Sequence, residues 1–258
     1  MSREWDANAY HRISGPQFSW GKKVLDRILL RGSELVMDAG CGTGKLTAEL
    51  LAQLPSGRVV GVDLSRNMLA GAREHLQPKF GKRASFIAAD LLQLPFVEVF
   101  DGIFSTAAFH WVPNHDKLFR NLHDALKQGG WLVAQCGGAG NLDRLLGRVD
   151  ELMDRPRYRE FLGEYQHPWV YSDADTAAER LQRAGFRQIE TSIEPAPTRF
   201  ETAEAYYEFV RKVILHRHLD RLPEKLRGEF MADIVELAAR DKPAFELDYW
   251  RLNLSARK

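Results

Sequence analysis

The chain has 258 residues, of which 45% are hydrophobic and 28% are charged, an ordinary balance for a globular protein. Its formal net charge of +1 gives no general attraction to nucleic acid, and no apolar run approaches the ~20 residues that span a bilayer. Residues 1–20 lack the apolar centre of a signal peptide. The two cysteines, Cys41 and Cys136, fit a reducing compartment without disulfides. We therefore expect a cytoplasmic protein without a nucleic-acid or membrane partner.

Residues 1–30 are predicted to form an N-terminal arm. The arm is rich in aromatic side chains, which are Trp5, Tyr10, Phe18 and Trp20. These side chains could cover the core of the domain, or they could form a lid over a bound ligand. Apolar residues at helical spacing follow, until Gly32 ends the pattern.

A glycine-rich stretch over residues 35–46 organises the rest of the chain. A short apolar run ends in Asp38, and Gly40, Gly42 and Gly44 follow at alternate positions. This pattern predicts a buried strand, a tight turn and the first turn of a helix. Glycine lets a ligand approach the backbone closely, and the free amides of such a turn favour a polar ligand group.

The spacing of these glycines separates three kinds of nucleotide site. Dinucleotide-binding folds usually carry Gly-x-Gly-x-x-Gly, whereas this chain has Gly-x-Gly-x-Gly. Asp38 would face a pyrophosphate badly but could receive a cationic ligand. A phosphate loop needs Ser or Thr after Gly-Lys, and Leu46 stands there instead. An NAD-dependent oxidoreductase is therefore disfavoured, and a phosphate loop is excluded.

The stretch from Asp38 to Gly44 resembles the glycine-rich motif of class I S-adenosylmethionine (SAM) methyltransferases. A second strand is predicted over residues 58–62, and Asp63 at its end could accept hydrogen bonds from two ribose hydroxyls. Asp63-x-Ser-x-x-Met also resembles these enzymes, in which Leu64 and Met68 would flank the adenine. Ser65 could instead cap the next helix, with Met68 in the core; the two roles are compatible.

Two later segments complete this resemblance. A third strand over residues 84–88 is followed by Asp90 and Leu91, where the carboxylate could receive the adenine amino group or cap a helix. The turn over residues 127–130 precedes a fifth strand over 131–136. The resemblance implies SAM as cofactor and S-adenosylhomocysteine as product. The implied cofactor-binding residues are Trp20, Asp38, Gly40, Cys41, Gly42, Gly44, Asp63, Leu64, Met68, Asp90, Leu91 and Ser105.

The segment after the predicted fourth strand (residues 100–105) should lie at the reacting centre, because ligands bind beyond the carboxyl ends of parallel strands. Asn/Asp-Pro-Pro-Tyr is missing there, which argues against nucleobase or glutamine acceptors. Ser105-x-x-x-x-His110-Trp111 instead resembles enzymes that methylate small molecules. His110 is the candidate base if the acceptor is a hydroxyl or a phenol; otherwise it shapes the pocket, and Trp111 contacts the substrate. No histidine has metal-ligand spacing.

The second half of the chain predicts a helix over 173–184, a sixth strand over 186–194, mostly helices over 195–243 and a last strand over 245–256. A helical stretch of ~50 residues is too long for a hairpin connection, so we expect it to form a substrate cap. The predicted core is 31–194 with 244–258. Its fold class is α/β: a Rossmann-like, seven-stranded mixed sheet with the last strand antiparallel.

This order of elements resembles the trans-aconitate methyltransferases and their relatives. In that group the cap binds a carboxylate substrate, and His216 and Arg217 occupy the equivalent segment here. A guanidinium can hold a carboxylate through two hydrogen bonds, although these side chains could equally form a solvated helix face. The segment departs from the Leu-Arg-Pro pattern of those enzymes, so the resemblance covers the architecture rather than trans-aconitate itself.

These observations predict a SAM-dependent methyltransferase that acts on a small molecule, most simply by O-methylation of a carboxylate. Methylation of a quinone-type or acyl precursor at carbon or oxygen is the alternative within enzymes. A SAM-binding regulatory protein without turnover is the alternative of another class, since the acids show only competence to bind. The sequence leaves the oligomeric state open.

Overall fold

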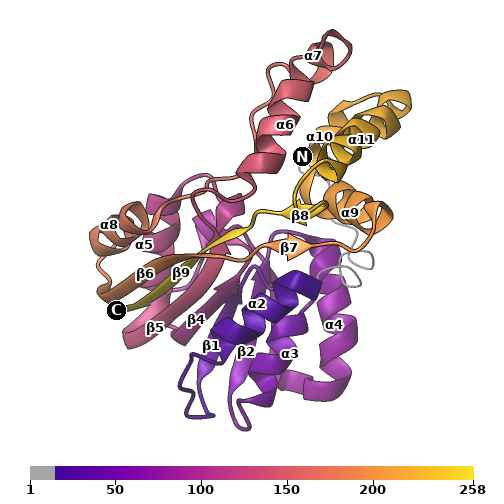
Figure 1. The fold of residues 1–258 in the computed structure, drawn as a ribbon. Coiled ribbons are helices and arrows are strands. Elements are labelled where there is room, and N and C mark those ends of the chain that lie inside the picture. The colour runs from indigo at the N-terminus through magenta and orange to yellow at the C-terminus, as the bar shows by residue number, and fades with distance from the viewer. Residues whose placement is uncertain (1–14) are drawn as a thin grey trace. The chain divides into compact units, whose positions relative to one another are not determined.

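The computed structural model describes residues 15–258 (Figure 1). Trp5 and Tyr10 of the predicted arm lie outside these residues. The described chain divides into two compact units. The first unit contains residues 15–139, 169–194 and 251–258, and the second contains residues 140–168 and 195–250.

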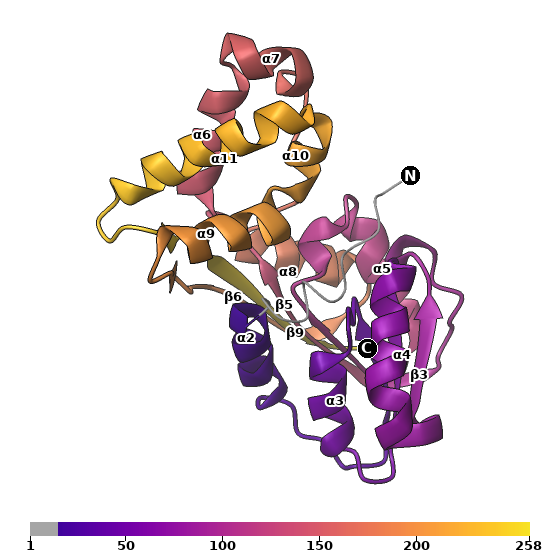
Figure 2. The same ribbon diagram turned by 90° about the vertical axis from the view of Figure 1, so that its right-hand side faces the viewer.

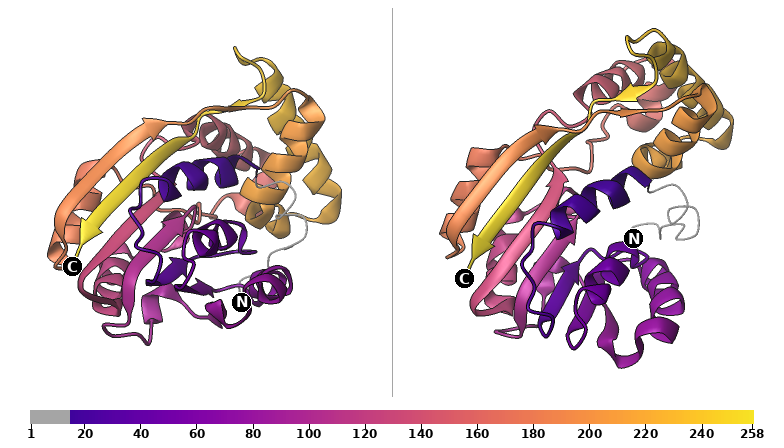
Figure 3. Two further views of the ribbon diagram at one scale, coloured as in Figure 1. Left: turned by 90° about the horizontal axis from the view of Figure 1, so that it is seen from below. Right: turned by 60° about the horizontal axis from the view of Figure 1, so that its bottom comes forward.

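The first unit is built on a sheet. Within residues 15–258, seven strands pair in the order β3-β2-β1-β4-β5-β9-β6 (Figure 3). Their bounds are β1 (Leu35–Ala39), β2 (Arg58–Asp63), β3 (Ala84–Ala88), β4 (Phe100–Thr106), β5 (Leu126–Gly137), β6 (Arg187–Pro195) and β9 (Trp250–Arg257). The pairs among β1 to β5 are parallel, whereas β9 runs antiparallel to β5. The predicted mixed sheet with an antiparallel last strand is confirmed.

Helices cover both faces of this sheet because the strands are apolar on both faces. Val36 of β1 belongs to a buried cluster with α2 (Gly15–Leu25), α3 (Lys45–Ala52) and α4 (Arg66–Phe80). Met37, the next residue, belongs to a cluster with α5 (His115–Ala125) and α8 (Ala174–Arg183). Such alternation is the pattern of a strand buried on both sides.

Short helices and side-chain caps shape the connections. The 3₁₀ turns are η1 (Gly81–Arg83), η2 (Leu91–Gln93) and η3 (Phe109–Trp111). The Ser65 hydroxyl accepts a hydrogen bond from the Met68 amide at the start of α4, so its predicted cap is confirmed. Asp173 caps α8 in the same way through the Thr176 amide.

The second unit is mainly helical (Figure 2). Its elements are α6 (Asp143–Met153), α7 (Pro156–Leu162), β7 (Thr198–Arg199), α9 (Ala203–Phe209), the π-helix η4 (Val210–Ile214), α10 (His216–Arg221), α11 (Glu224–Ala239) and β8 (Glu246–Leu247). β7 and β8 pair antiparallel. The predicted last strand over 245–256 is therefore divided into β8 and β9.

This unit is larger than the segment 195–243 predicted as a cap, because residues 140–168 belong to it as well. The physical link is the packing of α6 and α7 on α11. The rings of Tyr158 and Phe230 meet edge to face at 5.0 Å, and the Tyr158 hydroxyl donates to Asp233 over 3.1 Å. A role for this unit over the substrate stays a prediction. No helix in residues 15–258 combines the length and apolarity that crossing a bilayer requires.

Candidate functional site

The polar residues predicted to bind the cofactor gather at the carboxyl ends of neighbouring strands in the first unit. Asp38 lies near the end of β1, Asp63 ends β2, and Asp90 follows β3. Because β1, β2, β3 and β4 are parallel, these ends share one edge of the sheet. This edge is where open α/β sheets bind ligands.

The three loop glycines have different reasons to be glycine. All three have positive φ, at 81° for Gly40, 53° for Gly42 and 80° for Gly44. A Cβ on Gly40 would lie 2.2 Å from the Cβ of Ala108, and one on Gly44 would lie 2.6 Å from a methyl of Leu76. A Cβ on Gly42 would meet nothing within 4 Å. Gly40 and Gly44 therefore allow close packing, whereas Gly42 borders open space.

Asp38 is a buried acid, with a side chain held by α3. It is 3% exposed, and its Oδ2 accepts a hydrogen bond from the Thr47 hydroxyl over 2.6 Å. Burial, opposed by the Thr47 bond and reinforced by the charge of Asp63, raises the pKa of Asp38 to about 7. A cationic ligand group would favour the ionised carboxylate. The role of Asp38 toward the cofactor stays a prediction.

The Asp63 carboxylate joins the glycine loop to the start of α4 by hydrogen bonds. Its Oδ2 accepts from the Gly42 amide and its Oδ1 from the Ser65 amide, both over 2.9 Å. Each carboxylate oxygen has a second lone pair, so these bonds orient the group without exhausting its capacity. Next to it, Leu64 is 62% exposed, whereas Met68 is only 4% exposed. Of this predicted adenine-flanking pair, Met68 lies mostly in the core.

Asp90, Leu91, Cys41 and Ser105 also have structural partners. The Asp90 carboxylate caps η2 by accepting from the Leu92 amide over 2.8 Å, and Leu91 is buried. The Ser105 hydroxyl donates to the Ala39 carbonyl over 2.6 Å, which fastens β4 to the end of β1. Burial raises the pKa of the Cys41 thiol, so it stays protonated. The roles of these residues toward the cofactor stay predictions.

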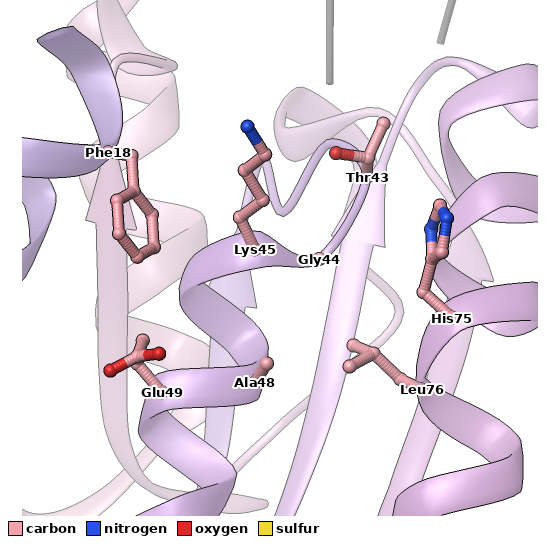
Figure 4. Close-up of a pocket in the computed structure, with 8 residues that line it drawn as sticks. All are labelled: Phe18, Thr43, Gly44, Lys45, Ala48, Glu49, His75 and Leu76. Carbon is pink, nitrogen blue, oxygen red and sulfur yellow. The ribbon is translucent and has the colours of Figure 1, made fainter. Parts of the chain in front are cut away.

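A cavity of about 340 Å³ lies on the helical side of the glycine loop (Figure 4). It is lined by Phe18, Thr43, Gly44, Lys45, Ala48, Glu49, His75 and Leu76. Phe18 comes from α2, Lys45 from α3 and His75 from α4. The acids at the strand ends do not line this cavity, which meets the predicted cofactor loop through Thr43 and Gly44.

His110 lies in η3 beyond the end of β4 and is 9% exposed. Its Nδ1 accepts a hydrogen bond from the Gly137 amide over 3.2 Å. An amide can only donate, so the ring proton of the neutral imidazole must be on Nε2. Burial, helped by the positive charge of Arg251 and by His115, lowers the pKa of His110 well below its usual range. His110 is therefore a neutral ring that offers an N–H, which weakens its prediction as a base.

Aromatic rings surround this histidine. The rings of Trp111 and Trp169 meet edge to face at 5.4 Å, and Trp169 stacks with Tyr171 at 6.1 Å. Tyr171 lies 5.9 Å from His110, and the Val170 amide donates to the His110 carbonyl over 2.8 Å. The sequence reasoning missed Trp169 and Tyr171. Two aromatic residues flanking one valine directly after Pro168 was the available signal.

A buried polar cluster fixes the segment that carries these rings. The Arg180 guanidinium donates to the Ser172 hydroxyl over 2.6 Å, and this hydroxyl lies 3.2 Å from Nδ1 of His115. The Ala139 amide donates to the Ser172 carbonyl. The aromatic rings are therefore held beside the end of β5.

Arg251 is the charged residue that the sequence reasoning passed over. It lies on β9 opposite Gly137, and only 3% of it is exposed. Its guanidinium lies 4.7 Å over the ring of Trp20, which comes from α2. The sequence signal for Arg251 was its charged side chain at one of the alternating positions of the predicted last strand. Trp20, predicted as a cofactor contact, thus stacks with a cation in this structure.

His216 and Arg217 lie on α10 in the second unit, and both are partly buried. The neighbouring His218 is fully buried, with Nε2 at 2.9 Å from Nδ1 of His167. His167 in turn reaches Asp150 over 3.0 Å. The prediction that His216 and Arg217 contact an acceptor stays a prediction.

Comparisons with known proteins identify the family of this chain. Residues 36–130 match a family model described as a methyltransferase domain. The chain is 32% identical over 190 residues to an uncharacterized methyltransferase of Schizosaccharomyces pombe, covering 70% of each protein. It is 30% identical over 210 residues to the trans-aconitate 2-methyltransferase of Rhodopseudomonas palustris, covering 80% of this chain and 74% of that enzyme. It is 28% identical over 248 residues to the enzyme of the same name from Variovorax paradoxus, covering 89% and 87%.

Solved structures show the same fold. Phosphoethanolamine N-methyltransferase 2 of Haemonchus contortus, in complex with S-adenosyl-L-methionine, aligns with a TM-score of 0.64 at 21% identity. The alignment covers 98% of this chain but only 56% of that enzyme, so this chain spans about half of its length. The strand-end acids, the glycine loop and the relatives together establish that this chain belongs to the class I SAM-dependent methyltransferases and that its cofactor is S-adenosylmethionine.

Proposed function

We propose that this enzyme methylates a carboxylate oxygen of a small organic acid. The observation that carries the proposal is the hydrogen bond from the Gly137 amide to Nδ1 of His110. A phenol, an alcohol or an ammonium group must lose a proton before it is methylated, and His110 was the best candidate for taking it. A carboxylate is already ionised near neutral pH and needs no base.

The reaction balances without proton transfer. S-adenosylmethionine, when bound, supplies an electrophilic methyl group on a sulfonium. The carboxylate oxygen bonds the methyl carbon as the carbon–sulfur bond breaks, with that electron pair passing to sulfur and leaving S-adenosylhomocysteine. Alignment of the two reactants can account for most of the acceleration in such a displacement.

The residues at the strand ends have separate roles in this proposal. Asp38 would face the cationic end of the cofactor, Asp63 would accept from the ribose hydroxyls, and Asp90 would accept from the adenine amino group. Gly42, which borders open space, would let the cofactor approach the loop backbone. His110 would donate its Nε2–H to one oxygen of the acceptor carboxylate, leaving the other oxygen to react.

The relatives support an acid as the acceptor. Enzymes named trans-aconitate 2-methyltransferase match this chain at 28–30% identity. In four of them the alignment covers 86–87% of the enzyme's length. Trp111, His216 and Arg217 are the sequence-predicted contacts for the acceptor. The acid itself need not be trans-aconitate, since the α10 segment departs from the pattern of those enzymes.

The test combines cofactor binding with the chemistry of the product. Titration calorimetry with S-adenosylhomocysteine should show binding. S-adenosylmethionine labelled in the methyl group should then transfer label to acids in a panel of di- and tricarboxylic acids, phenols and amines. Mild alkali releases labelled methanol from a methyl ester but leaves ethers and N-methyl groups intact. Alkali-stable label on a phenol or an amine would refute the proposal, and Asp38→Asn serves as the cofactor-site control.

A further inference from the structure

A series of hydrogen bonds in the first unit joins α8 to η3, and the direction of each bond is determined. The Arg180 guanidinium donates to the Ser172 hydroxyl over 2.6 Å. The Phe109 carbonyl lies 3.0 Å from Nε2 of His115 and can only accept, so the proton of the neutral ring must be on Nε2. Nδ1 of His115 then has the lone pair, and the Ser172 hydroxyl donates to it over 3.2 Å. We call these four groups the Ser172 network.

Burial and charge hold the Ser172 network in this one arrangement. His115 is 4% exposed and Ser172 is 5% exposed. A proton on Nδ1 of His115 would face the Arg180 guanidinium, whose Nη1 lies 3.5 Å away. Burial, opposed by the Phe109 carbonyl and reinforced by Arg180, lowers the pKa of His115, although the Asp116 carboxylate acts in the other direction. The buried hydroxyl and both ring nitrogens have partners, and a satisfied network of this kind keeps a single geometry.

The Ser172 network ends at residues that contact His110. Phe109 is the residue before His110 in η3. Two residues before Ser172, the Val170 amide donates to the His110 carbonyl over 2.8 Å. The ring of Tyr171, between them in the sequence, lies 5.9 Å from the imidazole. The network therefore joins the segment that carries His110 to a segment that packs against it.

The end of β5 and the two residues after it hold both of these segments. The Gly137 amide donates to Nδ1 of His110. The next residue, Gly138, forms a parallel bridge with Ser172, and the Ala139 amide donates to the Ser172 carbonyl over 3.0 Å. Three consecutive residues thus fix His110 and Ser172 together. A displacement of Ser172 would act on the stretch whose amide sets the proton position of His110.

These contacts matter because the neutral state of His110 depends on its surroundings. Burial is the largest cause of its lowered pKa, and Arg251 and His115 add to the effect. If the segment around Tyr171 moved away, water would reach the ring, and its pKa would rise toward the ordinary histidine value of about 6.5. The proton on Nε2 would then no longer be a fixed donor.

We propose that Ser172 and His115 are positioning residues for His110. Their network holds the segment from Trp169 to Tyr171 against the imidazole and so keeps the ring neutral, with Nε2–H as its donor. The placement of the ring follows from the contacts above. Its use as a donor to the acceptor carboxylate rests on the proposed function.

Nuclear magnetic resonance of protein labelled with nitrogen-15 histidine tests this placement without turnover, because a protonated ring nitrogen and one with a lone pair resonate at different positions. The protein is saturated with S-adenosylhomocysteine, and His110→Gln and His115→Gln assign the signals. We expect both wild-type rings to carry the proton on Nε2 at pH 7.5, and His110 not to titrate between pH 6 and 8. Ser172→Ala should bring the His110 titration into this range.

Thr191→Val is the matched control. The Thr191 hydroxyl donates to the Ala174 carbonyl over 3.0 Å, so this variant also loses one side-chain hydrogen bond in the first unit, but outside the Ser172 network. Its His110 signal should match wild type.

Three results in these spectra would overturn the inference. They are a wild-type proton on Nδ1 of either ring, a His110 signal in Ser172→Ala that matches wild type at every pH, and the same change in Thr191→Val as in Ser172→Ala. If Ser172→Ala does not fold, Arg180→Met decides. It removes the donor to Ser172 at the partly exposed end of the network and should also bring the His110 titration into range, and no change would overturn the inference.

Kinetics then test whether Ser172 acts through His110. Ser172→Ala should lower kcat toward the value of His110→Ala, by at most about tenfold. In the His110→Ala background the same change should alter kcat by less than about twofold, since two residues that act through one group are not additive. Full multiplication of the two effects would overturn the inference. If no acid is methylated, the proposed function fails, and the spectra alone decide the placement of the ring.

Discussion

The Gly137 amide donates a hydrogen bond to Nδ1 of His110 over 3.2 Å, and this contact determines the tautomer of a buried ring. The proton of the neutral imidazole must then be on Nε2, where it can be donated but where no lone pair is available. An isolated histidine at a reacting centre suggests a general base. Because of this main-chain contact, we expect His110 to act as a hydrogen-bond donor instead of a base.

The first prediction concerns the pH dependence of catalysis. We expect His110→Ala to lower kcat about tenfold, the loss of one hydrogen bond, and His110→Gln, which keeps an N–H near the Nε2 position, to lose less. The pH profile of kcat between 6 and 8, measured at saturating cofactor, should be flat in all three proteins because His110 stays neutral throughout. A limb in the wild-type profile that disappears in both variants would show that His110 acts as a base.

The second prediction concerns stability without cofactor. Burial raises the pKa of Asp38 from 3.8 to about 7 on folding, so the contribution of this group to stability is fully present below pH 3.8 and is lost as the pH rises to about 7. We expect Asp38→Asn, which can still accept from Thr47, to stabilise the cofactor-free protein at pH 7.5 by about 1 to 2 kcal/mol, roughly 2–8 °C in melting temperature. The gain should shrink at pH 5. Thermal melts at the two pH values provide the check, and a variant that melts lower than wild type at pH 7.5 contradicts it.

The third prediction concerns cofactor affinity and follows from the same shift. A cationic group binds best to ionised Asp38, so S-adenosylhomocysteine should bind more weakly as the pH falls below about 7, by up to tenfold per pH unit. Asp38→Asn should bind weakly at every pH, with no such slope. Calorimetry from pH 5.5 to 8 measures both proteins. Parallel curves for the two would mean that Asp38 does not face the cation.

The fourth prediction concerns Asp63. Its carboxylate holds the Gly42 and Ser65 amides, and we propose that it also accepts from the ribose hydroxyls. Asp63→Ala should therefore raise the Kd for S-adenosylhomocysteine about 10- to 100-fold, a loss of about 1.4 to 2.7 kcal/mol of binding free energy. Glu74→Ala, an exposed acid on α4, is the surface control. An unchanged Kd in Asp63→Ala would remove the ribose assignment.

The fifth prediction separates two glycines of one loop. Gly40→Ala places a Cβ 2.2 Å from that of Ala108, so it should lower the melting temperature strongly because packed backbone has to move. Gly42→Ala meets nothing within 4 Å, so its stability cost should be near the 1–2 kcal/mol of a left-handed residue. We expect Gly42→Ala to lose cofactor affinity nonetheless. Equal melting temperatures, or full binding by Gly42→Ala, would contradict this distinction.

Local patterns in the sequence were sufficient for the sheet and for the cofactor loop. The alternation of Val36 and Met37 between two buried faces is a property of neighbouring residues. The requirement for glycine at positions 40, 42 and 44 is likewise local, because it follows from the backbone angles of one tight turn. Asp63 and Asp90 could be placed because each directly follows a predicted strand, and parallel strands bring their ends to one edge.

The segments that make up the second unit could not be predicted in this way. Residues 140–168 join 195–250 through contacts between α7 and α11, such as Tyr158 with Phe230 and Asp233. Each helix shows only that it has an apolar face, and an apolar face does not specify its partner. The grouping depends on which faces fit together.

The sequence by itself determined the fold class, the cofactor loop and the order of the acids that follow it, because these depend on short-range periodicity and turn chemistry. Only the tertiary structure decided the surroundings of His110. The antiparallel pairing of β9 with β5 brings Arg251 beside Gly137, and the packing of α2 brings Trp20 over its guanidinium. Register between distant strands is set by the burial of whole faces, so no local pattern around residue 110 or residue 251 could reveal that the Arg251 charge lowers the pKa of His110.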